Sequence, residues 1–184
     1  MDANRHIEPT GLHPVKAGKL AGFLDAQSQT IGCVESCTGG LLGAALTAIP
    51  GSSAWFVGGL ITYSNTLKHQ LAGVPLDDLD TYGAVSGQVA QSMAQGGQRA
   101  LGSVWCVSIT GIAGPEGGSS EKPVGTVWIG VFGPDQAKQA RRFVFPGDRQ
   151  SVRSHTVAAA IDFVIDRVRG RDTVLEYECD RFEG

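Results

Sequence analysis

The chain of 184 residues lacks the features that would point to a membrane or a nucleic acid. Its first residues, MDANRHIEPTGLHPVKAG, contain no apolar core of a signal peptide, and no apolar run is long enough to span a bilayer. The net charge of -3 leaves no basic surplus to neutralise phosphates, which argues against a nucleic acid as the main partner. We therefore expect a cytoplasmic protein without a nucleic-acid or membrane partner.

Patterns for metal binding and for the common serine-hydrolase motif are also missing. Cys33 and Cys37 are separated by three residues, but no His or Cys pair elsewhere completes a zinc site. The four histidines are scattered, and none stands in a metal or triad pattern. No G-x-S-x-G is present, so a nucleophile elbow of the α/β-hydrolase type is not supported. We expect neither a metal nor a cofactor.

What the chain does have is an ordinary globular composition with an excess of glycine. It is 42% hydrophobic and 18% charged, and its length suits one domain. Strand-like and helix-like patterns alternate, and a strand pair precedes the last helix. This order predicts a single three-layer αβα domain with a mixed, mainly parallel sheet. We expect an N-terminal extension at 1–13, the domain at 14–170 and an acidic tail at 171–184. The 26 glycines indicate special turns and close backbone approach.

Three loops between predicted strands and helices carry unusual residues, and ligands of α/β domains bind at such loops. The first, ESCTGG, places Ser36, Cys37 and Thr38 side by side before a predicted helix at 39–48. The N–H groups of that helix and the flexibility of Gly39 and Gly40 suit an oxyanion or a phosphate. Alternatively, Ser36 or Thr38 only caps the helix. Cys37 is the strongest nucleophile of the three in solution, and a helix N-terminus would lower its pKa.

The second loop, ITYSNTLKHQLAGV, follows a predicted strand at 55–63. It contains Tyr63 at the strand end and Lys68 in the next helix. A lysine whose pKa is lowered by burial can act as a base toward a serine, and a tyrosine can relay a proton. The alternative is a surface lysine next to an aromatic strand end.

The third loop, TGIAGPEGGSSEKPVG, begins at Thr110 after a predicted strand at 104–110. Consecutive N–H groups in such a loop can bind an anion. The alternative is a connector with charged residues at its rim. The candidate binding residues of this loop are Thr110, Gly111, Gly114, Gly117 and Gly118.

Taken together, these loops resemble the CinA C-terminal-domain family. The stretches ESCTGG, GSSAWFVGGLITYSNTLKHQLAGV, GAVS, TGIAGPEGGSSEKPVGTVW and FPGDRQSVR follow one another as in that family, and the resemblance covers about Val15 to Val168. The family includes nicotinamide-nucleotide amidohydrolases, which convert nicotinamide mononucleotide to nicotinate mononucleotide and ammonia. The resemblance therefore implies an amidohydrolase acting on a small-molecule pyridine nucleotide, and we expect a homo-oligomer, a dimer or larger.

The resemblance also ranks the candidate residues. Ser36 matches the nucleophile of the family motif and Cys37 its variable position, while Tyr63 and Lys68 match the residues that activate the serine. Thr38, Gly39 and Gly40 would hold the oxyanion, and Thr110 and the glycine loop would form the opposite wall. Two other hypotheses remain open, a nucleotide-binding module without catalysis and an interaction protein in DNA uptake or damage response. The missing basic surplus argues against direct DNA binding.

Overall fold

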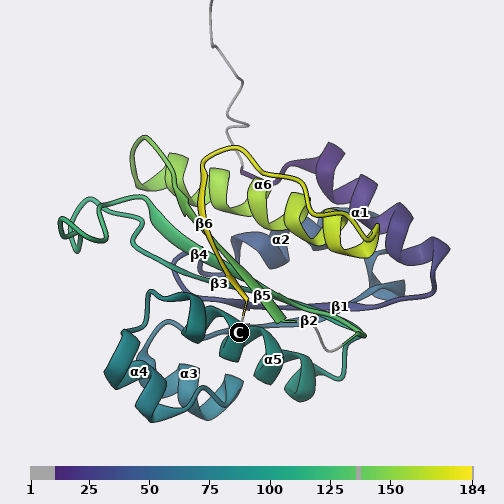
Figure 1. Cartoon of the computed structure of the whole chain (residues 1–184). Helices are drawn as coiled ribbons and strands as arrows, with labels where there is room; N and C mark the ends of the chain where they lie inside the picture. The colour runs from purple at the N-terminus through teal and green to yellow at the C-terminus, as the bar shows by residue number, and fades with distance from the viewer. Residues whose placement is uncertain (1–10, 136–137, 184) are drawn as a thin grey trace, which may run out of the picture.

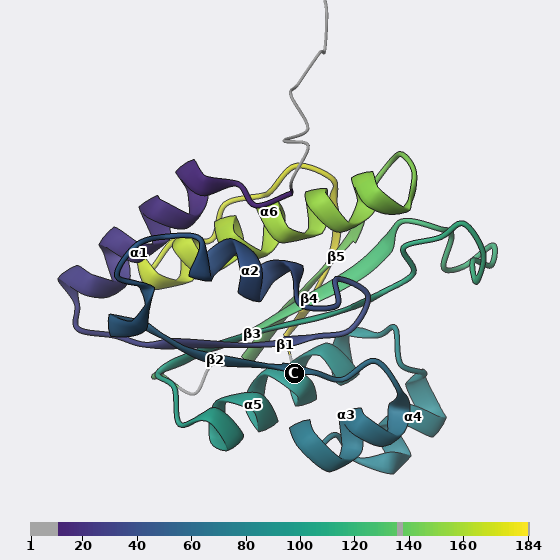
Figure 2. The ribbon, with the colours of Figure 1, turned by 180° about the vertical axis from the view of Figure 1, so that it is seen from behind.

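A mixed β-sheet forms the middle layer of the protein, and helices cover both of its faces (Figure 1, Figure 2). The computed structural model describes residues 11–135 and 138–183. The strands of the six-stranded sheet lie in the order β2-β1-β3-β4-β5-β6. Strands β2, β1 and β3 are parallel, while β4, β5 and β6 are added antiparallel. Their bounds are Ile31–Glu35 (β1), Phe56–Ile61 (β2), Trp105–Gly111 (β3), Thr126–Phe132 (β4), Lys138–Val144 (β5) and Glu178–Glu183 (β6).

Helices α1 (Pro14–Ala26), α2 (Leu41–Thr47) and α6 (Arg149–Val168) lie on one face of the sheet. Helices α3 (Asn65–Ala72), α4 (Leu76–Tyr82) and α5 (Gly87–Leu101) lie on the other. Each face buries its own cluster of apolar side chains against the sheet. The predicted three-layer α/β domain with a mixed sheet is confirmed. None of the described helices is long and apolar enough to cross a membrane.

Two elements of the structure were not predicted from the sequence. The first is α4, for which no helix was predicted, because it buries only Leu79 and so carries no apolar period. The acidic tail forms β6, which pairs with β5 although its sequence ECDRFE shows no apolar alternation. With β6 included, the sheet has two parallel and three antiparallel strand pairings. Most of the extension expected at 1–13 lies outside the described residues. The domain boundaries stay predictions.

Ser86 and Asp148 cap the N-termini of α5 and α6. The Ser86 hydroxyl accepts a hydrogen bond from the N–H of Val89 at 3.3 Å, at the start of α5. The Asp148 carboxylate accepts one from the N–H of Ser151 at 2.8 Å. These bonds satisfy N–H groups that have no partner inside the helix. The cap at Asp148 therefore sets the start of α6.

Helix α5 packs closely against α3 and β1 because two adjacent residues of the helix, Gly96 and Gly97, are glycines. A Cβ atom on Gly96 would lie 1.6 Å from the carbonyl oxygen of Ala72 at the end of α3. A Cβ atom on Gly97 would lie 2.2 Å from a methyl carbon of Val34 in β1. Only glycine permits this approach, which holds α3 against the layer that contains β1. The close packing thus fixes α3 relative to the carboxyl end of β1.

Candidate active site

Ser36 directly follows the central strand β1, at the edge where the parallel strands end. Its N–H donates to the carbonyl oxygen of Ile109 in β3 at 3.1 Å, and its own carbonyl accepts from Gly39 at 3.0 Å. The residue is thereby fixed between a strand and a tight turn. The Ser36 side chain lies on the wall of a cavity of about 300 Å³.

Lys68 approaches Ser36 from helix α3 on the opposite layer. The Lys68 residue is only 1% exposed, and its Nζ donates to the Ser36 hydroxyl at 3.0 Å and to the carbonyl oxygen of Thr62 at 2.9 Å. Burial lowers the pKa of Lys68 below its ordinary value, and the nearby Cys37 opposes this shift. The buried ammonium group has no carboxylate partner among the described residues. Burial therefore makes the charged form of Lys68 less favourable than it is in water.

Cys37 also lines the cavity, but its environment makes it a poor nucleophile. Burial raises the pKa of Cys37 to about 11, although its own backbone N–H and Lys68 act in the opposite direction. The thiol is protonated at neutral pH, and the thiolate is the reactive form. The lowered pKa expected from the helix N-terminus is therefore wrong.

Burial is the main cause, and Glu35, which occupies the N-terminus of α2, also raises the pKa of Cys37. Its buried carboxylate accepts hydrogen bonds from the N–H groups of Gly40, Leu42 and Gly43 at 3.0, 3.1 and 2.8 Å. The N–H of Gly39 donates to Ser36 as described above. The N–H groups of Gly39 and Gly40 are thus satisfied within the protein, and they are not open to an oxyanion as expected. In the described chain the N–H groups of Cys37 and Thr38 donate no hydrogen bond to the backbone of another residue.

Tyr63 lies at the rim of the cavity, and its side chain is not engaged with the serine. The residue is 61% exposed, and its hydroxyl accepts a hydrogen bond from Arg149 at 3.3 Å. Within the described chain it makes none to Ser36 or Lys68. Arg149 is the first residue of α6, and it also donates to the carbonyl oxygen of Gly114 at 2.8 Å. Its guanidinium group brings a positive charge to the cavity wall.

The loop after β3 forms another part of the cavity wall. Thr110 is buried and donates its hydroxyl to the carbonyl oxygen of Ala84 at 2.7 Å. Glycine is needed in the loop for packing, because a Cβ on Gly111 would meet Thr126 at 2.8 Å and one on Gly114 would meet Val124 at 2.6 Å. Of the predicted residues, the cavity brings together Ser36, Tyr63, Lys68, Thr110, Gly111, Gly114 and Gly117. The wall does not include Thr38, Gly39, Gly40 or Gly118.

Comparison with known proteins places this arrangement in a family. A family profile described as CinA C-terminal domain matches residues 15–168. The chain belongs to the CinA C-terminal domain family. A CinA family relative named nicotinamide-nucleotide amidohydrolase PncC, from Enterobacter agglomerans, is 51% identical over 135 residues, which are 73% of this chain and 82% of the relative.

Longer CinA relatives and solved CinA structures agree with this assignment. A CinA-like protein from Leptospira biflexa is 50% identical over 142 residues, and the match spans 77% of this chain but only 34% of that protein. The crystal structure of competence/damage inducible protein CihA from Agrobacterium tumefaciens superposes with a TM-score of 0.83 at 35% identity. It covers 88% of this chain and 97% of the other. The chain thus spans about a third of some CinA relatives and nearly all of others.

Two polar residues, Arg149 on the cavity wall and Glu35 behind Ser36, were not predicted from the sequence. Arg149 lies far from the other loops in sequence and resembles any basic residue at a helix start, although the stretch FPGDRQSVR contains it. The role of Glu35 was missed because a glutamate ending an apolar strand gives no signal of its three N–H partners. The roles of both residues depend on the fold, which brings the end of β1 and the start of α6 to the same edge of the sheet.

Proposed function

We propose that the chain hydrolyses the carboxamide of nicotinamide mononucleotide, giving nicotinate mononucleotide and ammonia, with Ser36 as the nucleophile. The observation that carries this proposal is the buried hydrogen bond between Lys68 and Ser36 on the cavity wall. The 51% identity to a protein named nicotinamide-nucleotide amidohydrolase supports the choice of substrate.

The first step is a proton transfer from Ser36 to Lys68. A neutral amine 3.0 Å from the hydroxyl is within the reach of a general base. The serine oxygen then attacks the carbon of the carboxamide, and the lysine holds the proton as an ammonium group. The lowered pKa of Lys68 supports this role, because it makes the neutral amine easier to reach than in an ordinary lysine.

The negative charge that develops on the carboxamide oxygen needs hydrogen-bond donors. We assign this role to the N–H groups of Cys37 and Thr38, which follow the nucleophile and donate to the backbone of no other residue in the described chain. In other hydrolases the loss of one such donor costs roughly 3 to 4 kcal/mol. The position variable in the family motif, Cys37, would then contribute through its backbone and not through its thiol.

The second half of the reaction returns the proton. The Lys68 ammonium group donates it to the amide nitrogen, the C–N bond breaks, and ammonia leaves an ester on Ser36. Water then loses a proton to Lys68 and attacks the ester carbon, which releases nicotinate mononucleotide and restores the serine. In the described chain the Tyr63 hydroxyl bonds to Arg149 and makes no hydrogen bond to Ser36 or Lys68, so we assign Tyr63 to substrate binding.

The phosphate of the substrate needs a cation at the other end of the cavity. Arg149 is the guanidinium group on the cavity wall, and arginine suits a phosphate because of its several parallel N–H donors. The glycine loop supports this arrangement through the bond from Arg149 to Gly114. We therefore propose that Arg149 binds the phosphate while the loop shapes the wall.

Ammonia release from nicotinamide mononucleotide, NAD and nicotinamide tests the proposed function. We expect turnover to be fastest with the mononucleotide and lost in the Ser36→Ala variant. A nucleotide-binding module without catalysis would instead show ligand-induced thermal stabilisation and no ammonia from any of the three. That result would contradict the proposal.

A further inference from the structure

The turn that follows Ser36 contains two glycines that give it little stiffness of its own. Gly39 and Gly40 both lie in the left-handed region of the backbone, with φ of 59° and 97°. Glycine enters and leaves this region without a steric cost. The proposed reaction nevertheless needs the Ser36 hydroxyl and the N–H groups of Cys37 and Thr38 in one fixed arrangement. Contacts from outside the turn therefore have to restrain it.

Arg153 of α6 makes such a contact at the carbonyl oxygen of Thr38. Its Nη2 donates to that oxygen at 2.7 Å. The same planar peptide unit contains the N–H of Gly39, which donates to the carbonyl oxygen of Ser36 at 3.0 Å. The peptide unit is thus held at both ends. Because the Glu35 carboxylate holds the start of α2, the turn is restrained from two sides.

Arg153 is bound to the turn and to no other polar group of the described chain. Its Nε is buried without a partner among the described residues, and its guanidinium group forms no ion pair with them. A hydrogen bond from a charged donor is stronger than one between neutral groups, so this contact restrains the turn. Arg153 does not line the cavity of the candidate active site. Any effect of Arg153 on the reaction therefore passes through Thr38.

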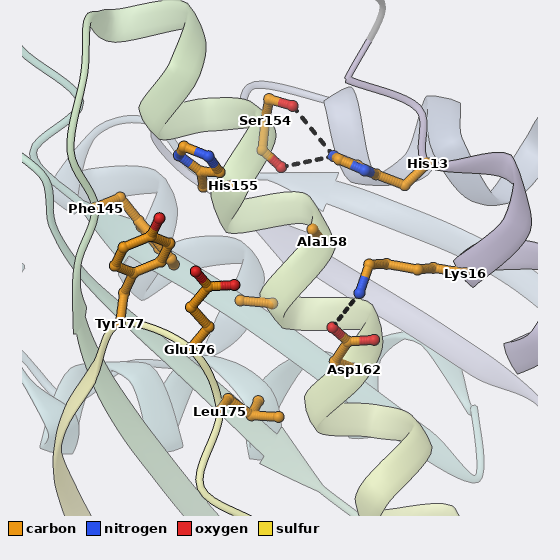
Figure 3. Close-up of a pocket in the computed structure, with 11 residues that line it drawn as sticks. His13, Lys16, Phe145, Ser154, His155, Ala158, Asp162, Leu175, Glu176 and Tyr177 are labelled. Carbon is orange, nitrogen blue, oxygen red and sulfur yellow. Dashed lines mark hydrogen bonds and ion pairs between the residues drawn. The ribbon is translucent and has the colours of Figure 1, made fainter. Parts of the chain in front are cut away.

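Helix α6 holds Arg153 in a fixed position because α6 is joined to α1. The Nε2 of His13 lies 2.8 Å from the carbonyl oxygen and 3.1 Å from the hydroxyl oxygen of Ser154, the residue after Arg153. Further along α6, Asp162 forms an ion pair with Lys16 of α1. Figure 3 shows both contacts beside a cavity of about 280 Å³. The arginine thus extends to the turn from a helix that is anchored on its other side.

We propose that Arg153 is a positioning residue of the amidase reaction, an inference that rests on the proposed function. Arg153 fixes the peptide unit after Thr38, and with it the serine hydroxyl and the two N–H groups assigned to the oxyanion. Arg149, one turn earlier on α6, lines the cavity and has a different role, the binding of the phosphate. The two arginines therefore differ in kinetics. Loss of Arg153 acts on kcat, whereas loss of Arg149 acts mainly on KM.

Steady-state ammonia release from nicotinamide mononucleotide by the full chain tests the proposal. We expect Arg153→Ala to lower kcat by roughly 10- to 100-fold with little change in KM, because a small misplacement of reacting groups is costly. Arg153→Lys keeps a charged donor and is expected to recover part of the loss. Arg99→Ala, on the exposed surface of α5, is the matched control and is expected to keep the wild-type kcat. A wild-type kcat in Arg153→Ala would overturn the proposal.

Added guanidinium separates positioning from a general loss of structure. The Arg153 side chain lines a cavity of about 400 Å³, so a free guanidinium ion can reach the space that Arg153→Ala vacates. We expect millimolar guanidinium to raise the kcat of this variant severalfold, and urea, which is neutral and of similar shape, to leave it unchanged. A lowered melting temperature, with no response to guanidinium and no recovery in Arg153→Lys, would show a merely structural role and overturn the proposal.

Ser36→Ala in the same assay tests the reaction itself. We expect this variant to release no ammonia, with or without guanidinium. Turnover that persists in Ser36→Ala contradicts the proposed function, whereas a wild-type kcat in Arg153→Ala contradicts the role of Arg153 alone. The two failures are therefore distinguishable.

Discussion

At the scale of the residue, the unusual group is a lysine buried without a carboxylate. Lys68 has two oxygen partners, the Ser36 hydroxyl and a backbone carbonyl. Neither carries a charge that would stabilise the ammonium form. Such a lysine is costly to keep charged, and a neutral amine next to a serine is a combination suited to nucleophilic catalysis.

The pH dependence of activity follows from this environment. The base must be neutral, so kcat/KM rises with pH as Lys68 loses its proton, and the lowered pKa moves this rise below the pH of an ordinary lysine. Lys68→Arg keeps the charge but cannot release the proton at any accessible pH, so we expect it to abolish turnover. Ammonia release measured across pH checks both statements. A Lys68→Arg variant with near wild-type kcat would show that the lysine is not the base.

The phosphate role of Arg149 can be tested by comparing two substrates. Arg149→Ala is expected to reduce kcat/KM for nicotinamide mononucleotide by roughly 10- to 100-fold, the value of a charged hydrogen bond. Nicotinamide riboside lacks the phosphate and is expected to be a poor substrate that changes little in this variant. Arg99→Ala, an exposed arginine of α5, is the control. Equal losses for the two substrates would remove the phosphate from the account.

At the scale of the element, the tail is the least predictable part of the fold. The central strands and long helices could be predicted because their apolar periods reflect burial. Strand β6 could not be predicted, because its stability depends on Arg141 in β5. Strand β5 is far from β6 in the sequence although the two strands pair in the sheet. For the same reason the sequence could identify Ser36 and Lys68 as candidate residues. It could not predict that Glu35 accepts hydrogen bonds from the N–H groups at the start of α2.

The buried Arg141 anchors the tail through hydrogen bonds to Glu178 at 3.3 Å and to Asp172 at 2.6 Å, which leads to a stability prediction. The side chain of Glu178 is 4% exposed, and its loss leaves part of a buried charge uncompensated, so we expect Glu178→Ala to destabilise the fold by roughly 3 kcal/mol. Asp172, whose side chain is 49% exposed, is the matched control in the same cluster, with an expected loss of about 1 kcal/mol or less. Urea unfolding measures both. Equal small losses would mean that the cluster does not hold the tail.

At the scale of the whole molecule, the site is assembled from both helical layers around the ends of β1 and β3. Helix α3 brings the lysine from one side, and α6 brings the arginine from the other. Oligomerisation stays a prediction, which light scattering of the purified chain can check.

The assembly also predicts that activity is independent of metal ions. In the described part of the chain, no three His, Cys, Asp or Glu side chains come together as a metal site would require. The proton acceptor in the proposed reaction is an amine. We therefore expect EDTA to leave ammonia release unchanged. A loss with EDTA that zinc or manganese restores would contradict the serine reaction.

The most direct test of the central claim is to measure kcat for ammonia release in Ser36→Ala and Cys37→Ala side by side. Thermal stabilisation by the substrate serves to confirm that both variants fold and bind. We predict that Ser36→Ala loses at least about 10³-fold in kcat, as for other serine nucleophiles, while Cys37→Ala retains most of its activity. Thr38→Ala is expected to fall between them. An inactive Cys37→Ala together with an active Ser36→Ala would show that the nucleophile is the cysteine and would contradict the account.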